Sequence, residues 1–418
     1  MTPNQTFVLK TKIFSKNESS LFAYAPIKFY YYCSVKNRKL VNYLLQTFSL
    51  EQLIVLALVS LALFIQLYYY LFVYLKPVLW KQKSANDETE PLSVIICARN
   101  ESENLKNFLP KVLEQHYPEF EVIVVNDCSE DDTETVLAEL QLKHKHLKHT
   151  TIEPDRKFSH GKKLALTIGM KAARYEYLVF TDADCYPESE NWLSEINKAY
   201  THKKQIVLGY GGYENKKGLL NKIIRFDTLF IALQYLGFAQ TGRPYMGVGR
   251  NLSYNKSVFF GGNGFLKHYK LLSGDDDLFV NENANKKNTA VVISKDSITR
   301  SLPQTNFSQW AKQKKRHLTT GKYYKFGDKF FLTLEVFSRL FFYFGLLGLF
   351  FVNFIPEIIA GIFAFRLFIQ LLIIKLGMNK LGEKGFWLLT PVLDIILPVF
   401  NLFFIFSNQL NKRNRKWK

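Results

Sequence analysis

The stretch YLVFTDADCYP, Tyr177–Pro187, places two carboxylates directly after an apolar run. The run predicts a buried strand, and Asp182 and Asp184 stand at its end, separated by one alanine. Each negative charge disfavours ionisation of the other, so we expect a counter-charge close by. Carboxylate oxygens at this spacing suit a hard divalent cation. The alternative is that both carboxylates cap the turn and helix that follow, because DCYPES contains turn-forming residues.

Two further apolar runs precede this stretch, LSVIICA at Leu92–Ala98 and FEVIVV at Phe120–Val125. Each continues into polar turn residues and then into a segment with a helical spacing of apolar residues. Continuous apolar runs of this kind are typical of parallel strands covered on both faces. Ligands of such sheets bind at the carboxyl ends of the strands. We therefore expect one sheet edge to carry Arg99, Glu101, Asp127, Asp182 and Asp184.

Apolar residues make up 48% of the 418-residue chain, and they gather in blocks on either side of this region. Leu50–Leu75 carries one charge, at its start, and is long enough to cross a bilayer as a retained anchor. The C-terminal block divides into three segments, at about 330–354, 358–374 and 386–406. We expect the third segment to be re-entrant or interfacial, because it is interrupted by Pro391, Asp394 and Pro398.

These patterns divide the chain into six parts. They are an N-terminal extension of unclear role (1–48), a transmembrane anchor (49–76), a linker (77–90), an α/β domain (91–325), a hydrophobic membrane region of about three segments (326–408) and a basic tail (409–418). We assign most of the net charge of +19 to the cytoplasmic membrane surface. Nucleic acid is not an expected partner, because no recognised module is present. We expect an integral protein of the inner or plasma membrane, with the α/β domain and the tail facing the cytoplasm.

Six short motifs follow one another in the α/β domain: PLSVIICARNE, EVIVVNDCSEDDT, GKKLAL, TDADC, SGDDDLF and QKKRH. In this order they resemble the motifs of membrane-bound family 2 glycosyltransferases, over about residues 91–325. The resemblance implies an α/β domain of the GT-A, Rossmann-like fold with a mainly parallel sheet. It also implies a divalent metal, Mg²⁺ or Mn²⁺, a nucleotide-sugar donor, and an acceptor that is a lipid or a glycan.

The resemblance implies donor-binding roles for the first four motifs. Asp184 would coordinate the metal, and Asp182 would hold the ribose or share the metal. Asp127 would accept a hydrogen bond from the nucleotide base, the alternative being a helix N-cap. The same pocket would be lined by Ala98, Arg99 and Glu101. Lys162 lies beside a helix start and suits contact with a phosphate, and we expect one of Lys162 and Lys163 to be solvated.

The remaining motifs imply the acceptor chemistry. An inverting displacement needs a base within reach of the acceptor hydroxyl, and the resemblance assigns this role to Asp276, with Asp275 as second choice. The alternative is that these acids form the first turn of a helix. QKKRH resembles a Q-x-x-R-W element that closes over the diphosphate, and it supplies Gln313, Arg316 and His317. The wall on the acceptor side would include Gly249, Arg250 and Asn251.

The expected activity is that of a membrane-anchored inverting glycosyltransferase, which moves one hexose from a UDP-sugar to a lipid or glycan acceptor at the cytoplasmic face. One alternative is a processive polysaccharide synthase. The few C-terminal segments and His317, which replaces the tryptophan of the motif, weigh against it. A second alternative is a scaffold with a degenerate, non-catalytic domain, and the intact carboxylates of three motifs weigh against this.

Overall fold

The computed structural model describes residues 47–81, 88–153, 161–201 and 203–410. The predicted N-terminal extension and the basic tail therefore lie almost entirely outside the described residues. The chain divides into two units after Leu58, and of the first unit the structure describes residues 47–58. Helix α2 (Leu50–Tyr68) runs from the first unit into the second, and continues through a π-helical turn, η1 (Tyr69–Tyr74), into α3 (Leu75–Val78). The predicted anchor is thus a continuous helical segment.

A seven-stranded sheet forms the centre of the α/β domain, in the order β3-β2-β1-β4-β8-β6-β9. Its strands are β1 (Leu92–Ala98), β2 (Phe120–Asp127), β3 (Leu147–Ile152), β4 (Tyr177–Phe180), β6 (Ile206–Leu208), β8 (Leu252–Asn255) and β9 (Thr289–Val291). Strands β1 to β4 pair in parallel, and β8 runs antiparallel to both of its neighbours. The prediction of an α/β domain with a mainly parallel sheet is confirmed.

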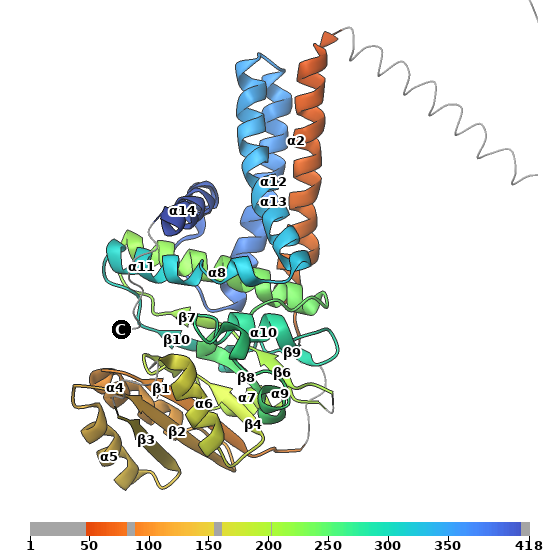
Figure 1. The fold of residues 1–418 in the computed structure, drawn as a ribbon. Coiled ribbons are helices and arrows are strands. Elements are labelled where there is room, and N and C mark those ends of the chain that lie inside the picture. Colours follow the sequence, from red (N-terminus) through yellow and green to blue (C-terminus); the bar gives the residue numbers. More distant parts are fainter. Residues whose placement is uncertain (1–46, 82–87, 154–160, 202, 411–418) are drawn as a thin grey trace, which may run out of the picture. The chain divides into compact units, whose positions relative to one another are not determined.

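The central strands are apolar on both faces because helices cover both faces of the sheet (Figure 1). Ile95 of β1 belongs to the hydrophobic cluster that contains residues of α6, while Val94 and Ile96 belong to the cluster that contains residues of α4 and α5. Successive side chains of a strand point to opposite faces, so a continuous apolar run feeds two cores. The helices of the domain are α4 (Ser102–Leu113), α5 (Thr133–Lys143), α6 (Lys162–Ala172), α7 (Trp192–Asn197), α8 (Leu219–Gln240), α9 (Lys256–Phe260), α10 (Asp277–Asn283) and α11 (Phe307–His317).

A second sheet has three strands, and its first strand follows β4 in the sequence. Its order is β5-β10-β7, with β5 (Cys185–Pro187), β7 (Gly211–Tyr213) and β10 (Thr299–Ser301). Strand β10 pairs antiparallel to β5 and parallel to β7. Because β5 begins at the residue after Asp184, this small sheet fixes the backbone that carries the acidic motif.

Within the part of the chain that the structure describes, four helical segments are long and apolar enough to cross a membrane: Leu50–Val78, Phe326–Phe351, Pro356–Lys380 and Trp387–Ser407. The last three correspond to α12 (Phe326–Phe351), α13 (Pro356–Lys380) and α14 (Thr390–Leu410). Each begins or ends a few residues away from its predicted bounds, and α13 continues to Lys380, beyond the predicted end at 374.

Helix α14 differs from the expectation of an interrupted segment, because it continues through Pro398. Asp394 is buried within the second unit and pairs with Arg339 of α12 and Arg366 of α13, so it does not face lipid. Figure 1 shows α14 running across the direction of α12 and α13. The expectation that this segment does not span the membrane stays a prediction.

Candidate active site

Polar side chains from three predicted motifs line one small pocket at the carboxyl edge of the large sheet. Strands β1, β2 and β4 are parallel, so the loops after them leave the same edge. The pocket is lined by Cys97, Lys162, Leu166, Phe180, Thr181, Asp182, Gly249, Leu252, Tyr254, Asp275 and Asp276. Residues as far apart in the sequence as Cys97 and Asp276 therefore meet where a ligand of an α/β sheet is expected.

Lys162 connects two of the acidic motifs. Its Nζ atom lies 2.7 Å from Oδ1 of Asp182 and 3.1 Å from Oδ2 of Asp275. Burial acts to lower the pKa of Lys162, but the negative charges of Asp182, Asp275 and Asp276 outweigh it and raise the pKa well above its usual range. The lysine is therefore charged, and it supplies a counter-charge of the kind expected near Asp182.

The environment of Lys163, the neighbouring lysine, differs from our expectation. We expected one of the two lysines to be solvated, but Lys163 is buried, and its Nζ donates to the carbonyl oxygens of His268, Leu271 and Ser273 at 2.6–2.8 Å. Burial lowers the pKa of Lys163, while the nearby acids act against this. The ammonium group holds the loop before the SGDDDLF motif against α6, a role that local sequence pattern does not reveal.

Asp184 lies at the start of the small sheet and is held by two neighbours. Ser301 of β10 donates its hydroxyl to Oδ2 at 3.2 Å, and the Cys185 thiol lies 3.3 Å from Oδ1. Burial, and then the negative charge of Asp182, raise the pKa of Asp184. This is the electrostatic situation predicted for paired carboxylates.

The residues around Asp184 fit a hard divalent cation. Ligand atoms of Asp182, Asp184 and Cys185 all lie within 4.8 Å of one another. Burial raises the pKa of the Cys185 thiol well above its usual range, so the thiol stays protonated and is a poor metal ligand. Two carboxylates remain as the donors, and oxygen donors are those that Mg²⁺ and Mn²⁺ prefer.

Asp276 and Asp275 have different environments, although they are adjacent. Asp276 is the N-cap of α10, and its carboxylate accepts from the backbone amides of Gly249 at 2.8 Å and Asp277 at 2.7 Å. Burial, together with the charges of Asp275 and Asp277, raises the pKa of Asp276 to about 7. Burial acts to raise the pKa of Asp275 as well, but Lys162 outweighs it and holds that pKa below its usual value. Asp276 is therefore the better candidate for a base near neutral pH.

Asp277 has a structural contact that the sequence did not indicate. Its carboxylate accepts hydrogen bonds from the hydroxyls of Thr320 and Tyr324, which follow α11 in the chain. Asp277 thereby ties α10 to the segment after the QKKRH motif. The alternative that these acids form the first turn of a helix holds for Asp277, with Asp276 as the N-cap, and it does not exclude the catalytic role.

The QKKRH motif forms the end of α11. Lys314 is buried and pairs with Asp227 of α8. This ion pair anchors α11 to α8. Arg316 and His317 are exposed, and Gln313 is partly buried. Surrounding protein atoms, and then the positive charges of Arg316 and Lys314, lower the pKa of His317 to about 3, although part of its side chain reaches solvent.

The predicted base-binding residues lie at the ends of β1 and β2. Ala98 closes β1 and pairs with Asn126, while Asp127 is buried at the end of β2. Arg99 is partly buried, and Glu101 is the N-cap residue of α4. Cys128, which follows Asp127, has a φ of 56°, so the backbone adopts there the left-handed conformation that favours glycine.

Gly249, Arg250 and Asn251 form a short 3-10 helix, η2 (Gly249–Asn251), but they serve different purposes. Gly249 lies in the pocket and donates its amide to Asp276. Arg250 donates its Nε to the carbonyl of Gly211 at 2.8 Å. Asn251 is buried, and its amide joins the backbone of Tyr210 and Ser297 to the Trp192 indole. The Asn251 side chain is thus occupied in holding the scaffold together.

Comparison with known proteins adds three findings. Residues 93–265 match the family model "Glycosyl transferase family 2". The poly-beta-1,6-N-acetyl-D-glucosamine synthase of Staphylococcus epidermidis is 34% identical over 158 residues, 37% of this chain and 37% of that protein. The protein of the same name from Staphylococcus aureus (strain COL) is 34% identical over 138 residues, 33% of this chain and 32% of that protein. The match thus spans about a third of the length of these curated relatives.

A solved structure shares the fold of the chain. The mannosyltransferase PcManGT from Pyrobaculum calidifontis, in complex with GDP-Man and Mn²⁺, superposes with a TM-score of 0.57. The superposition covers 87% of this chain and 99% of that chain, with 15% sequence identity. At this identity the likeness concerns the fold alone.

Proposed function

We propose that the chain is a membrane-anchored inverting glycosyltransferase, because residues 93–265 match the model of glycosyl transferase family 2 and the chain shares its fold with a solved mannosyltransferase. It transfers a sugar from a nucleotide sugar to a lipid or glycan acceptor. The observation that carries this proposal is the meeting of two acidic motifs at Lys162, with Asp276 beside them at a pKa of about 7.

The donor would lie along the carboxyl edge of the sheet. The nucleoside would be bound by Asp127, Arg99, Ala98 and Glu101. Asp182 and Asp184 would hold a divalent cation, which when bound neutralises the diphosphate and stabilises the leaving group. Lys162 and the exposed guanidinium of Arg316 would supply further positive charge to the diphosphate, as Gln313 closes over it from α11.

Asp276 would act as the base of the transfer. Its carboxylate takes the proton of the acceptor hydroxyl while that oxygen attacks the anomeric carbon. The bond from that carbon to the diphosphate breaks, the nucleoside diphosphate leaves on the opposite side, and the configuration inverts. The amides of Gly249 and Asp277 fix the carboxylate in place during this step. Asp275, paired with Lys162, stays ionised and keeps the lysine oriented.

UDP-N-acetylglucosamine is the first donor to test, because the curated relatives are named as synthases of a poly-N-acetylglucosamine. We propose that the active site faces the cytoplasm, where nucleotide sugars are made, and that membrane lipid surrounds the hydrophobic helices.

The test is a screen of the purified full-length chain in detergent against nucleotide sugars, with detection of the released nucleoside diphosphate and of the glycosylated acceptor. Turnover by the wild type, and no transfer by Asp276→Asn with retained donor binding, is the expected result. Equal transfer by the variant would contradict the assignment of the base.

A processive polysaccharide synthase is the second candidate function, and the names of the curated relatives favour it. His317 argues against it, because the imidazole offers a smaller stacking face than the indole of the family motif. Product length separates the two candidates. With donor in large excess over acceptor, single transfer gives one added sugar per acceptor, whereas a ladder of long chains in the mass spectrum would establish the synthase.

A further inference from the structure

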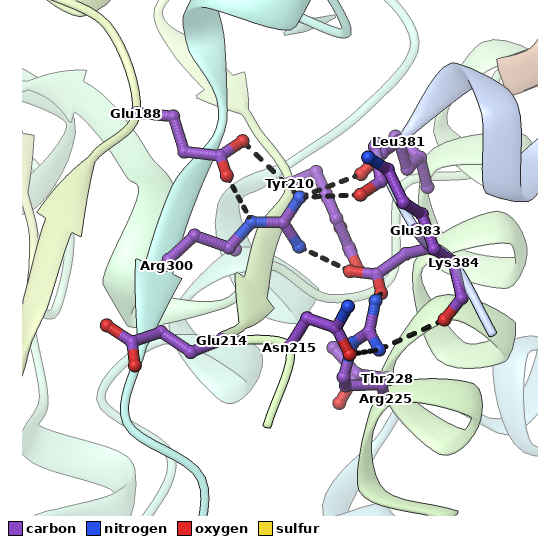
Figure 2. A network of polar contacts seen from close by, with 12 residues as sticks. Glu188, Tyr210, Glu214, Asn215, Arg225, Thr228, Arg300, Leu381, Glu383 and Lys384 are labelled. Carbon is purple, nitrogen blue, oxygen red and sulfur yellow. Dashed lines mark hydrogen bonds and ion pairs between the residues drawn. The ribbon is translucent and has the colours of Figure 1, made fainter. Parts of the chain in front are cut away.

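A buried network of ion pairs connects the small sheet to the loop between α13 and α14 (Figure 2). Glu383 of this loop accepts hydrogen bonds from Arg300 of β10 and from the Tyr210 hydroxyl, the latter at 2.9 Å. Its second oxygen lies 2.6 Å from Nη2 of Arg225 in α8, and the side chains of Glu383 and Arg225 are 0% and 2% exposed. Buried charges are costly unless they are paired and hydrogen-bonded. The network therefore holds the loop in one place.

Arg300 is fixed from several sides. Its Nε donates to Glu188 at 2.9 Å, and its Nη2 donates to the carbonyl oxygens of Leu381 and Gly382 at 3.2 Å each. Strand β7 passes directly beside the guanidinium. A Cβ atom placed on Gly212 of this strand would lie only 2.2 Å from Nη1 of Arg300. The side chain has no space to move toward β7, and a planar group with this many partners has one position.

The other face of β10 supports the acidic motif. Side chains alternate along a strand, so Thr299 and Ser301 point away from the side that Arg300 occupies. Ser301 pairs with Cys185 in the ladder to β5, and its hydroxyl donates to Asp184 at 3.2 Å. One three-residue strand thus has the buried network on one face and a carboxylate of the candidate metal site on the other.

We propose that Glu383 is a positioning residue for Asp184. It fixes Arg300, and through the backbone of β10 it sets the place of the Ser301 hydroxyl that orients the metal-binding carboxylate. A loop that follows a hydrophobic helix thereby influences the geometry of the donor site. This inference rests on the proposed metal at Asp182 and Asp184, but it does not depend on which sugar or acceptor the enzyme uses.

The test is the affinity of the full-length chain for Mn²⁺, measured in detergent with UDP present, from the paramagnetic resonance signal of the free ion against a protein-free baseline. We expect Ser301→Ala to weaken Mn²⁺ binding by about 10- to 100-fold, as is usual when a ligand loses the partner that orients it. Glu383→Gln keeps the size of the side chain and removes its charge, and we expect it to weaken binding by about tenfold. If that variant does not fold, Gly212→Ala displaces Arg300 without removing a charge, and the same direction is expected.

Glu335→Gln is the matched control. Glu335 is an equally buried glutamate, 1% exposed, paired with Arg339 in α12. Both glutamine variants are expected to lower the thermal midpoint, but only the change at Glu383 should alter the Mn²⁺ dissociation constant. If Glu383→Gln loses stability and keeps wild-type Mn²⁺ affinity, or if Glu335→Gln weakens binding equally, the inference is wrong.

A further variant, Asp184→Asn, separates this inference from the function on which it rests. Loss of Mn²⁺ binding in Asp184→Asn, with unchanged binding in Glu383→Gln and Ser301→Ala, would overturn the positioning role alone. Wild-type Mn²⁺ binding in Asp184→Asn would overturn both the proposed metal ligand and the positioning role.

Discussion

Replacing Asp276 by asparagine should abolish sugar transfer and, at pH 8, stabilise the protein. The pKa of Asp276 is raised from 3.8 to about 7, first by burial and then by the charges of Asp275 and Asp277. A carboxyl with a raised pKa binds its proton more tightly in the folded state than in the unfolded state. Stability is therefore lost as the pH rises from about 4 to about 7, and the full penalty is present above that range. A shift of about 3 units corresponds to ~4 kcal/mol as an upper limit.

The asparagine variant removes this penalty and loses one interaction. The two oxygens of Asp276 accept from the amides of Gly249 and Asp277, and asparagine offers only one acceptor oxygen, at a cost of about 1 kcal/mol. The net gain at pH 8 is then at most ~3 kcal/mol. The gain should shrink as the pH falls through 7 and reach zero between about pH 4 and pH 5. At lower pH, where the wild-type carboxyl becomes protonated in both states, only the cost of about 1 kcal/mol for the lost hydrogen bond remains.

Asp275→Asn is the control, and the opposite sign is expected for it. Lys162 holds the pKa of Asp275 below its usual value, so the folded state favours the charged form and the substitution should destabilise.

The assays are thermal unfolding in detergent at pH 5 and pH 8, and sugar transfer across the same range. Wild-type transfer should fall about tenfold for each pH unit below 7. A pH-independent rate between pH 6 and 8, or an Asp276→Asn protein less stable than wild type at pH 8, would refute the reasoning.

Three further predictions concern other parts of the chain. Cys128→Gly should raise the free energy of unfolding by about 1 kcal/mol, because glycine adopts the left-handed backbone at φ 56° without strain; a lower thermal midpoint would contradict this. Donor turnover should stop in EDTA and return with Mn²⁺ or Mg²⁺, whereas full activity in excess chelator would remove the metal from the proposal. Arg316→Ala should reduce transfer by roughly 10- to 1000-fold if its charge stabilises the leaving group, and an unchanged rate would assign Arg316 to the surface.

The strands and the edge of the sheet could be predicted from the sequence because their signals are local. The run LSVIICA predicted a strand at Leu92–Ala98, and β1 has these bounds. The acids after β2 and β4 could be placed at one edge because parallel strands end together. The ordered motifs then indicated a resemblance to a family, and with it a phosphate contact for Lys162, whereas its ion pairs with Asp182 and Asp275 were seen only in the structure.

The contacts that orient the site could not be predicted in the same way. Ser301 lies 117 residues from Asp184, and Lys163 bonds to carbonyls more than 100 residues away. Such contacts depend on where a loop returns in space, and neither composition nor periodicity carries that information. For Asn251 the sequence suggested a contact that the structure does not favour. We expected it in the wall on the acceptor side, but its side-chain amide donates to backbone carbonyl oxygens inside the domain.

The Arg300–Glu383 pair has a consequence for anyone who wants to isolate the catalytic part as a soluble fragment. By sequence, residues 91–325 look like a complete domain, yet Arg300 takes a buried partner 83 residues further along the chain, and Arg225 shares it. A fragment that stops before α12 would leave two guanidinium groups in the interior without this acid. Removing one partner of a buried pair typically costs about 3–5 kcal/mol, a large share of the stability of a domain. The unit that folds therefore extends to the loop after α13, and expression would have to include the helices that lead to it.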